Sequence, residues 1–120
     1  MKINLDFIPT ELHIVFCKDH YKGLMDDHGV INDFSSHGVT TVLEKDNFHY
    51  IVACVDMWAM HDQEYKADNM QGVLIHELSH VVSEIFLRHG FNCDELRSYL
   101  LQHLYLKSSP ILTEFFDKLK

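Results

Sequence analysis

Residues 73–87 read VLIHELSHVVSEIFL, and this stretch decides the fold that we expect for the chain. Its apolar residues recur every three or four positions, as in a helix that buries one face. They are Val73, Leu74, Leu78, Val81, Val82, Ile85 and Phe86. Gly90 follows shortly after, and a glycine just past a helix is a common left-handed stop. We therefore predict a half-buried helix that ends at Gly90 and is capped at its start by Asp68 or Asn69.

The centre of this helix carries His76, Glu77 and His80, which form the pattern HExxH. Histidines four residues apart lie one turn apart on the same helix face, so their imidazoles can converge on one metal ion. Glu77 can then reach a water on that metal. With ten histidines and seven glutamates in 120 residues, shuffling yields this pattern in roughly one sequence in twenty. The amphipathic helix around it favours a metal site over a pair of solvated surface histidines.

The composition of the chain limits the types of protein and of partner that we expect. A length of 120 residues, with 47% hydrophobic and 23% charged residues, predicts one globular domain. The net charge of −8 argues against a nucleic-acid partner or a membrane surface, because both are bound through Lys and Arg. The start MKINLDFIP lacks the apolar core of a secretory signal, and Cys17, Cys54 and Cys93 lack a CxxC pair. We therefore expect a cytoplasmic protein with reduced thiols.

The remaining segments predict a small sheet and further helices. Extended structure is expected at 3–8, 11–17, 39–44 and 48–55, the last two forming a hairpin. Helices are expected at 18–28, 93–107 and 111–119, with Asp19 and Asn92 as caps and with a break at Ser108-Ser109-Pro110. The loop before the motif helix offers Trp58, His61 and Tyr65 as cleft-lining residues, although ordinary loop packing explains them as well. The fold class is therefore α+β, with a small, mostly antiparallel sheet on the HExxH helix.

A catalytic zinc ion normally takes three protein ligands and keeps a fourth position for water. HExxH supplies two, so a third must come from elsewhere. We favour Glu95, because the first turn of the next helix folds back towards the motif in a helical hairpin. Glu95 could instead form a capping box with Asn92, and four other candidates remain open: Asp94, His89, Cys93 and His103.

The chemistry follows from these residues. Zinc would lower the pKa of its bound water, and Glu77 would take a proton from that water and pass it to the leaving amine. Tyr99, one turn after Glu95, is our candidate donor to the oxyanion, although a tyrosine at such a position also suits core packing.

HELSHVV followed by DELRSYLLQHLY resembles the small zincin-type proteins of tailed bacteriophages and prophages, over about residues 48–106. Their pattern is an HExxH helix, a short turn, then an acidic pair and a Tyr-Leu on the next helix; Ser98, before the Tyr, is a mild departure. The resemblance implies a minimal zincin-like fold of the gluzincin type and a metallopeptidase of the host cytoplasm. It assigns the zinc ligands to His76, His80 and Glu95 and the general base to Glu77. The chain is more distantly similar to the ImmA/IrrE-like proteases, which cleave repressors.

Two functions are consistent with the sequence. The first is a zinc-dependent peptidase that binds a protein or peptide along a sheet edge by strand addition. The second is a non-enzymatic interaction module that uses zinc for structure. The intact Glu77 favours the peptidase, because a purely structural zinc site does not need it.

Overall fold

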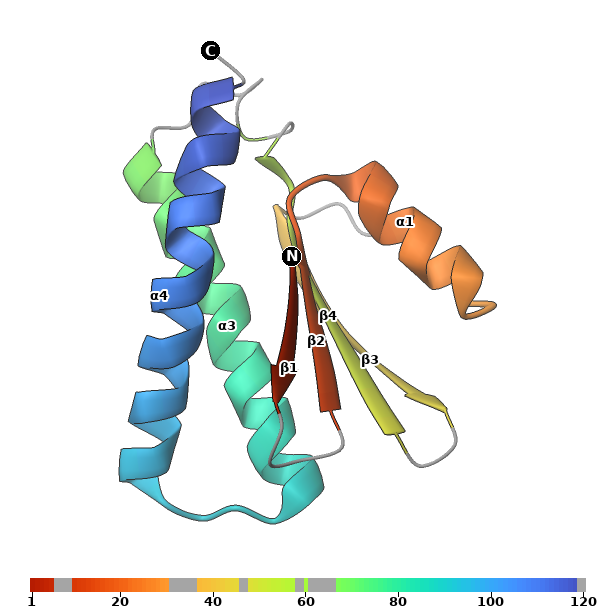
Figure 1. Cartoon of the computed structure of the whole chain (residues 1–120), viewed down its shortest axis with the longest axis vertical. Helices are drawn as coiled ribbons and strands as arrows, with labels where there is room; N and C mark the ends of the chain where they lie inside the picture. The colour runs from red at the N-terminus through yellow and green to blue at the C-terminus, as the bar shows by residue number, and fades with distance from the viewer. Residues whose placement is uncertain (6–9, 31–36, 46–47, 58–59, 61–66, 119–120) are drawn as a thin grey trace.

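A four-stranded mixed sheet forms the middle layer of the computed structural model, which describes residues 1–5, 10–30, 37–45, 48–57, 60 and 67–118. The strands are β1 (Lys2–Leu5), β2 (Thr10–Val15), β3 (Gly38–Lys45) and β4 (Phe48–Val55), in the order β1-β2-β4-β3. Helix α1 (Lys18–Asp27) covers one face, while α3 (Ala67–His89) and α4 (Asp94–Lys118) cover the other (Figure 1). The predicted α+β class is confirmed.

The strand pairing explains why β3 lies at an edge. β3 and β4 form the predicted antiparallel hairpin, and β1 pairs antiparallel with β2. β2 and β4 are parallel, because the chain passes through α1 and β3 between them. The sheet is therefore mostly antiparallel, as predicted, and among the described strands β3 pairs with β4 alone.

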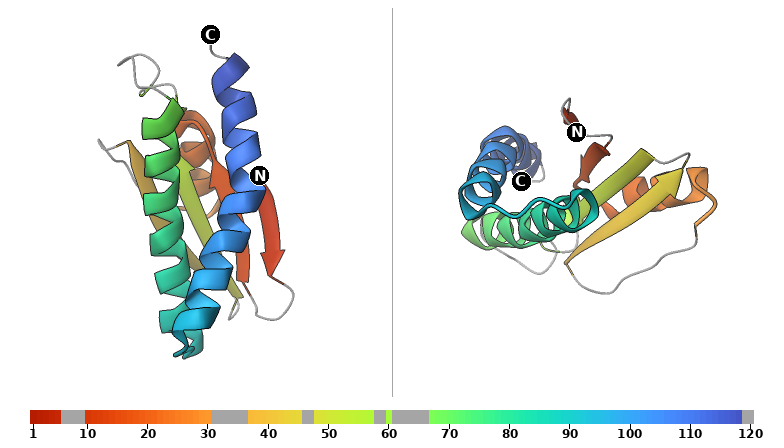
Figure 2. Two further views of the ribbon diagram at one scale, coloured as in Figure 1. Left: turned by 90° about the vertical axis from the view of Figure 1, so that its left-hand side faces the viewer. Right: turned by 90° about the horizontal axis from the view of Figure 1, so that it is seen from below.

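Strand β4 is apolar on both faces because helices cover both of them. Ile51, Ala53 and Val55 belong to the core beneath α3 and α4, whereas Val52 and Cys54 belong to the core beneath α1. This alternation follows from the two-residue period of a strand. The later half of the strand, residues 51–55, is therefore buried between the helices on either face of the sheet (Figure 2).

Helix α3 confirms the predicted motif helix and extends it at the start. It begins at Ala67, so the prediction that Asp68 or Asn69 caps it was wrong: both lie in its first turn. The reason is that Met70 is fully buried and adds one more turn to the apolar face. The predicted stop is confirmed, because Gly90 has a φ of 70°.

The prediction of two separate helices at 93–107 and 111–119 was wrong. The break at Ser108-Ser109-Pro110 does not occur, and one helix runs from Asp94 to Lys118 with Pro110 inside it. Proline removes one backbone hydrogen bond, but the following turns pack on the core: Leu112 is buried and the Phe115 ring lies 5.9 Å from that of Phe16. Tertiary packing outweighs the local signal.

The helix starts also differ in detail from the caps predicted. The backbone N–H of Arg97 donates to the carbonyl of Cys93 at 3.0 Å, so Cys93 rather than Asn92 occupies the cap of α4. Cys17 precedes α1, and Asp19 lies in its first turn instead of capping it. All three cysteines are free thiols. Over the described ranges, no helix is long and apolar enough to cross a membrane.

Candidate metal centre

The two motif histidines meet at their ring nitrogens. His76 and His80 follow one another on the same face of α3, with ring centroids 4.7 Å apart and an interplanar angle of 82°. Their Nε2 atoms lie 3.1 Å apart, and both residues are exposed. The spacing of four residues therefore produces the convergence that the sequence predicts.

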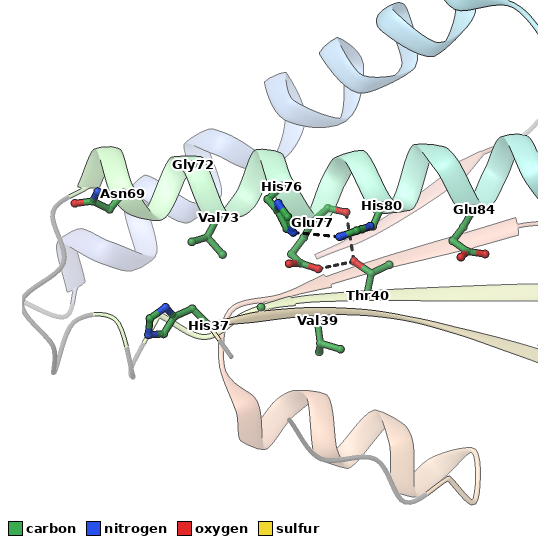
Figure 3. A pocket seen from close by; sticks show the side chains of 11 residues that line it. His37, Val39, Thr40, Asn69, Gly72, Val73, His76, Glu77, His80 and Glu84 are labelled. Carbon is green, nitrogen blue, oxygen red and sulfur yellow. Dashed lines mark hydrogen bonds between the residues drawn. The ribbon is translucent and has the colours of Figure 1, made fainter. Parts of the chain in front are cut away.

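The pair opens on a pocket of about 730 Å³ between α3 and the start of β3 (Figure 3). Helix α3 contributes Asn69, Gly72, Val73, His76, Glu77, His80 and Glu84 to the lining. The strand side contributes His37, Gly38, Val39 and Thr40. A concave site that gathers several polar groups beside an edge strand is a typical place for a ligand.

Glu77 lies beneath the histidine pair and is held by β3. Its side chain is 5% exposed, and the Thr40 hydroxyl donates to Oε1 at 2.8 Å. A buried carboxylate without such a donor would carry a large desolvation cost. Gly38 faces the other oxygen: a Cβ at that position would lie 2.7 Å from Glu77 Oε2. The strand therefore fixes the carboxylate and needs a glycine to approach it.

Helix α4 does not bring Glu95 to the pair. Gln71 bonds Ser109 and Thr113, and Arg97 bonds Ser83, so the two helices form an antiparallel hairpin. On that register Glu95 is level with Phe86, six residues past His80, which is about 9 Å along the helix axis.

Helix α4 also packs on a side of α3 from which its residues do not face the histidine pair. Figure 2 shows α4 and β3 on different sides of α3, and the pocket lies on the side of β3. Tyr99, the predicted oxyanion donor, is 65% exposed on α4, and the described lining of the pocket includes no residue of that helix.

The other candidate ligands also lie away from the pair. Asp94, Cys93 and His103 are exposed at the start or on the outside of α4. His89 ends α3 and bonds Thr10, with Nε2 2.8 Å from Oγ1. Trp58, His61 and Tyr65 lie outside the described residues. Within the parts of the chain that the structure describes, no group of three His, Cys, Asp or Glu side chains is placed to hold a metal ion.

The histidine pair itself fits a zinc ion. Two nitrogens that bind one zinc at about 2.05 Å with a tetrahedral angle lie about 3.3 Å apart. The observed 3.1 Å is close to that value. The donor set of two imidazoles with a carboxylate beside them also suits zinc chemistry.

Among the pocket residues that the sequence did not identify as part of a site are His37, Gly38, Thr40 and Glu84. Glu84 is one turn beyond His80, so helical spacing could have found it. Gly38 and Thr40 of β3, and His37 just before that strand, reach the pocket through tertiary packing, which no local pattern reveals.

Comparison with models of protein families, with curated proteins and with solved structures found no match. The similarity to phage-encoded zincins and to ImmA/IrrE-like proteases therefore stays a prediction.

Proposed function

We propose that this protein is a zinc-dependent peptidase in which His76 and His80 bind the metal and Glu77 is the general base. The observation that carries the proposal is the 3.1 Å approach of the two Nε2 atoms above a buried glutamate, in a pocket beside an edge strand. We do not include Glu95 among the ligands, because α4 holds it away from the pair. A zinc ion held by His76 and His80 would supply Lewis-acid chemistry, lowering the pKa of a water and polarising the substrate carbonyl.

The chain's own residues perform the proton transfers. Glu77 accepts a proton from the attacking water and donates it to the leaving nitrogen. Thr40 donates to Oε1 and thereby fixes the orientation of the carboxylate. The Thr40 hydroxyl also lies 3.3 Å from the backbone carbonyl of Glu77, a second acceptor for the same hydrogen on the same turn of helix.

The substrate we propose is an extended peptide that pairs with β3. The outer backbone groups of an edge strand can take another strand, and β3 lies along the pocket. Such pairing would carry the scissile bond past His76 and His80.

A non-enzymatic zinc-binding module is the second candidate. It is favoured by the bond from Thr40 to Glu77, because a buried carboxylate that is held in this way can serve the fold without taking part in catalysis.

The variant Glu77→Gln separates the two functions. It keeps the shape of the side chain and one oxygen that can accept the Thr40 hydroxyl, but it cannot accept the proton. We expect the variant to bind zinc as the wild type does and to lose peptide hydrolysis by about 100-fold or more, measured with zinc-loaded protein on a mixed peptide library. Equal hydrolysis by both proteins would contradict the role of Glu77. No hydrolysis by the zinc-loaded wild type would favour the binding module.

A further inference from the structure

Glu84 is the one carboxylate besides Glu77 in the described lining of the pocket, and the proposed chemistry does not use it. It lies one turn beyond His80 on the same helix and its side chain is 34% exposed. Figure 3 shows it at the end of the pocket opposite His37. We propose that Glu84 selects a peptide with a Lys or Arg side chain two or three residues before the scissile bond. The proposal rests on the proposed function.

The pairing of Glu84 leaves it able to change partner. Its Oε2 accepts a hydrogen bond from Arg88 Nε at 3.1 Å, one turn further along α3. Both side chains are about one-third exposed, and exposed pairs of this spacing contribute little to stability. A cationic side chain from a ligand could therefore replace Arg88 or share the carboxylate with it.

Charge also favours a cationic ligand. The chain carries a net charge of −8, which attracts cationic peptides to its surface. In the described lining of the pocket there is no Lys or Arg side chain that would bind an acidic residue instead.

The direction of β3 sets the position of the cationic residue. Gly38 lies against Glu77, while Glu44 lies beside His49, which contacts His89. β3 and α3 therefore run in the same direction. A peptide that pairs antiparallel with β3 runs the opposite way, so its N-terminal part lies at the Glu84 end.

The distance along the helix gives the spacing. Glu84 is four residues past His80, about 6 Å along the axis. An extended chain covers that distance in about two residues. The cationic side chain is therefore expected two or three positions on the N-terminal side of the bond that is cleaved.

Binding can be tested without cleavage. The probes are capped, fluorescein-labelled octapeptides of Ala and Val that carry one Lys, one Glu or one norleucine at the third position. They are titrated into zinc-loaded Glu77→Gln protein and followed by fluorescence anisotropy. We expect the Lys peptide to bind about three- to fivefold more tightly than the norleucine peptide, and the Glu peptide to bind more weakly than both.

The double variant Glu77→Gln/Glu84→Gln should lose this preference. The matched control is Glu114→Gln in the same background, which removes an equivalent pair with Lys118 on α4, away from the pocket; it should keep the preference. Orientation is read from a nitroxide on either end of the Lys peptide, where the N-terminal label should broaden the amide signals near Glu84 and the C-terminal label those near Asn69.

Three results would overturn the inference: no peptide binding, a Lys preference that survives Glu84→Gln, or the reverse orientation. Loss of bound zinc in Glu84→Gln would also overturn it, because Glu84 would then be a metal ligand. Failure of the peptidase proposal looks different, since the peptides would bind with the expected preference and remain intact with the wild type.

Discussion

The structure contains two pairs of histidines with nearly the same ring geometry and very different surroundings. His76 and His80 meet edge to face at 82°, and His49 and His89 do so at 83°. The first pair comes from one helix, is exposed and faces a pocket. The second joins β4 to the end of α3, and there Thr10 already bonds His89 Nε2 at 2.8 Å.

The difference teaches that ring geometry alone does not make a metal site. The His49 ring is largely covered, and its Nδ1 has no hydrogen-bond partner among the described residues. Burial, and then the nearby His49, lower the pKa of His89. This second pair therefore serves to dock the end of α3 on the sheet, whereas the exposed pair joins one ring nitrogen to the other at the edge of a pocket.

The largest expected effect is a difference in zinc affinity between variants of the two histidine pairs. His76→Ala should weaken zinc affinity by on the order of 100-fold or more, because one of the two proposed ligands is lost. His89→Ala should leave the affinity within about twofold of the wild type. Competition titration with a chromophoric chelator measures both. A large loss of zinc affinity in His89→Ala would place the metal at the second pair and contradict the distinction between the two pairs.

A substitution at Gly38 tests how closely β3 approaches Glu77, which lies beneath the exposed histidine pair. Gly38→Ala would place a Cβ 2.7 Å from Glu77 Oε2, and we expect the free energy of unfolding to fall by about 1–3 kcal/mol. Gly23→Ala is the control, because a Cβ at Gly23 in α1 would meet no atom within 4 Å; it should stabilise by about 0.5–1 kcal/mol. Urea denaturation measures both variants. An unchanged midpoint for Gly38→Ala would mean that the strand and Glu77 are not in contact.

The smallest expected effect concerns the pH dependence of the second pair. The pKa of His89 is lowered from 6.5 in the folded chain, so the unfolded chain binds the proton first as the pH falls. The stability from neutral His89 is present above about pH 6.5 and is lost as the pH falls through the folded pKa. Unfolding midpoints at pH 7.5 and 5.5 should differ more for the wild type than for His89→Gln. Equal differences would show that His89 is not the group responsible.

Local patterns predicted much of the fold. The apolar period of 73–87 located α3, and the two β-rich runs located the β3–β4 hairpin. The break expected at Pro110 was wrong, because the local signal carried no information on the core that Leu112 and Phe115 join. The parallel pairing of β2 with β4 likewise arises from topology rather than from either segment.

The candidate site, like the fold, was predicted from the sequence only in part. His76, Glu77 and His80 lie within one helical turn, so spacing alone placed them together. Thr40 and Gly38 reach Glu77 across 37 and 39 residues of sequence, and no local pattern links them. The placement of Glu95 assumed that the next helix passes on the side of the histidines, whereas α4 packs on another side of α3.

The most direct test of the account is the zinc content of untagged protein, purified and dialysed in parallel as wild type, His80→Ala and Glu95→Ala. We predict about one zinc per chain in the wild type and in Glu95→Ala, and almost none in His80→Ala. No zinc in the wild type after zinc is supplied would contradict the metal centre itself. Loss of zinc in Glu95→Ala would contradict the arrangement of α4 and restore the ligand set that the family resemblance implies.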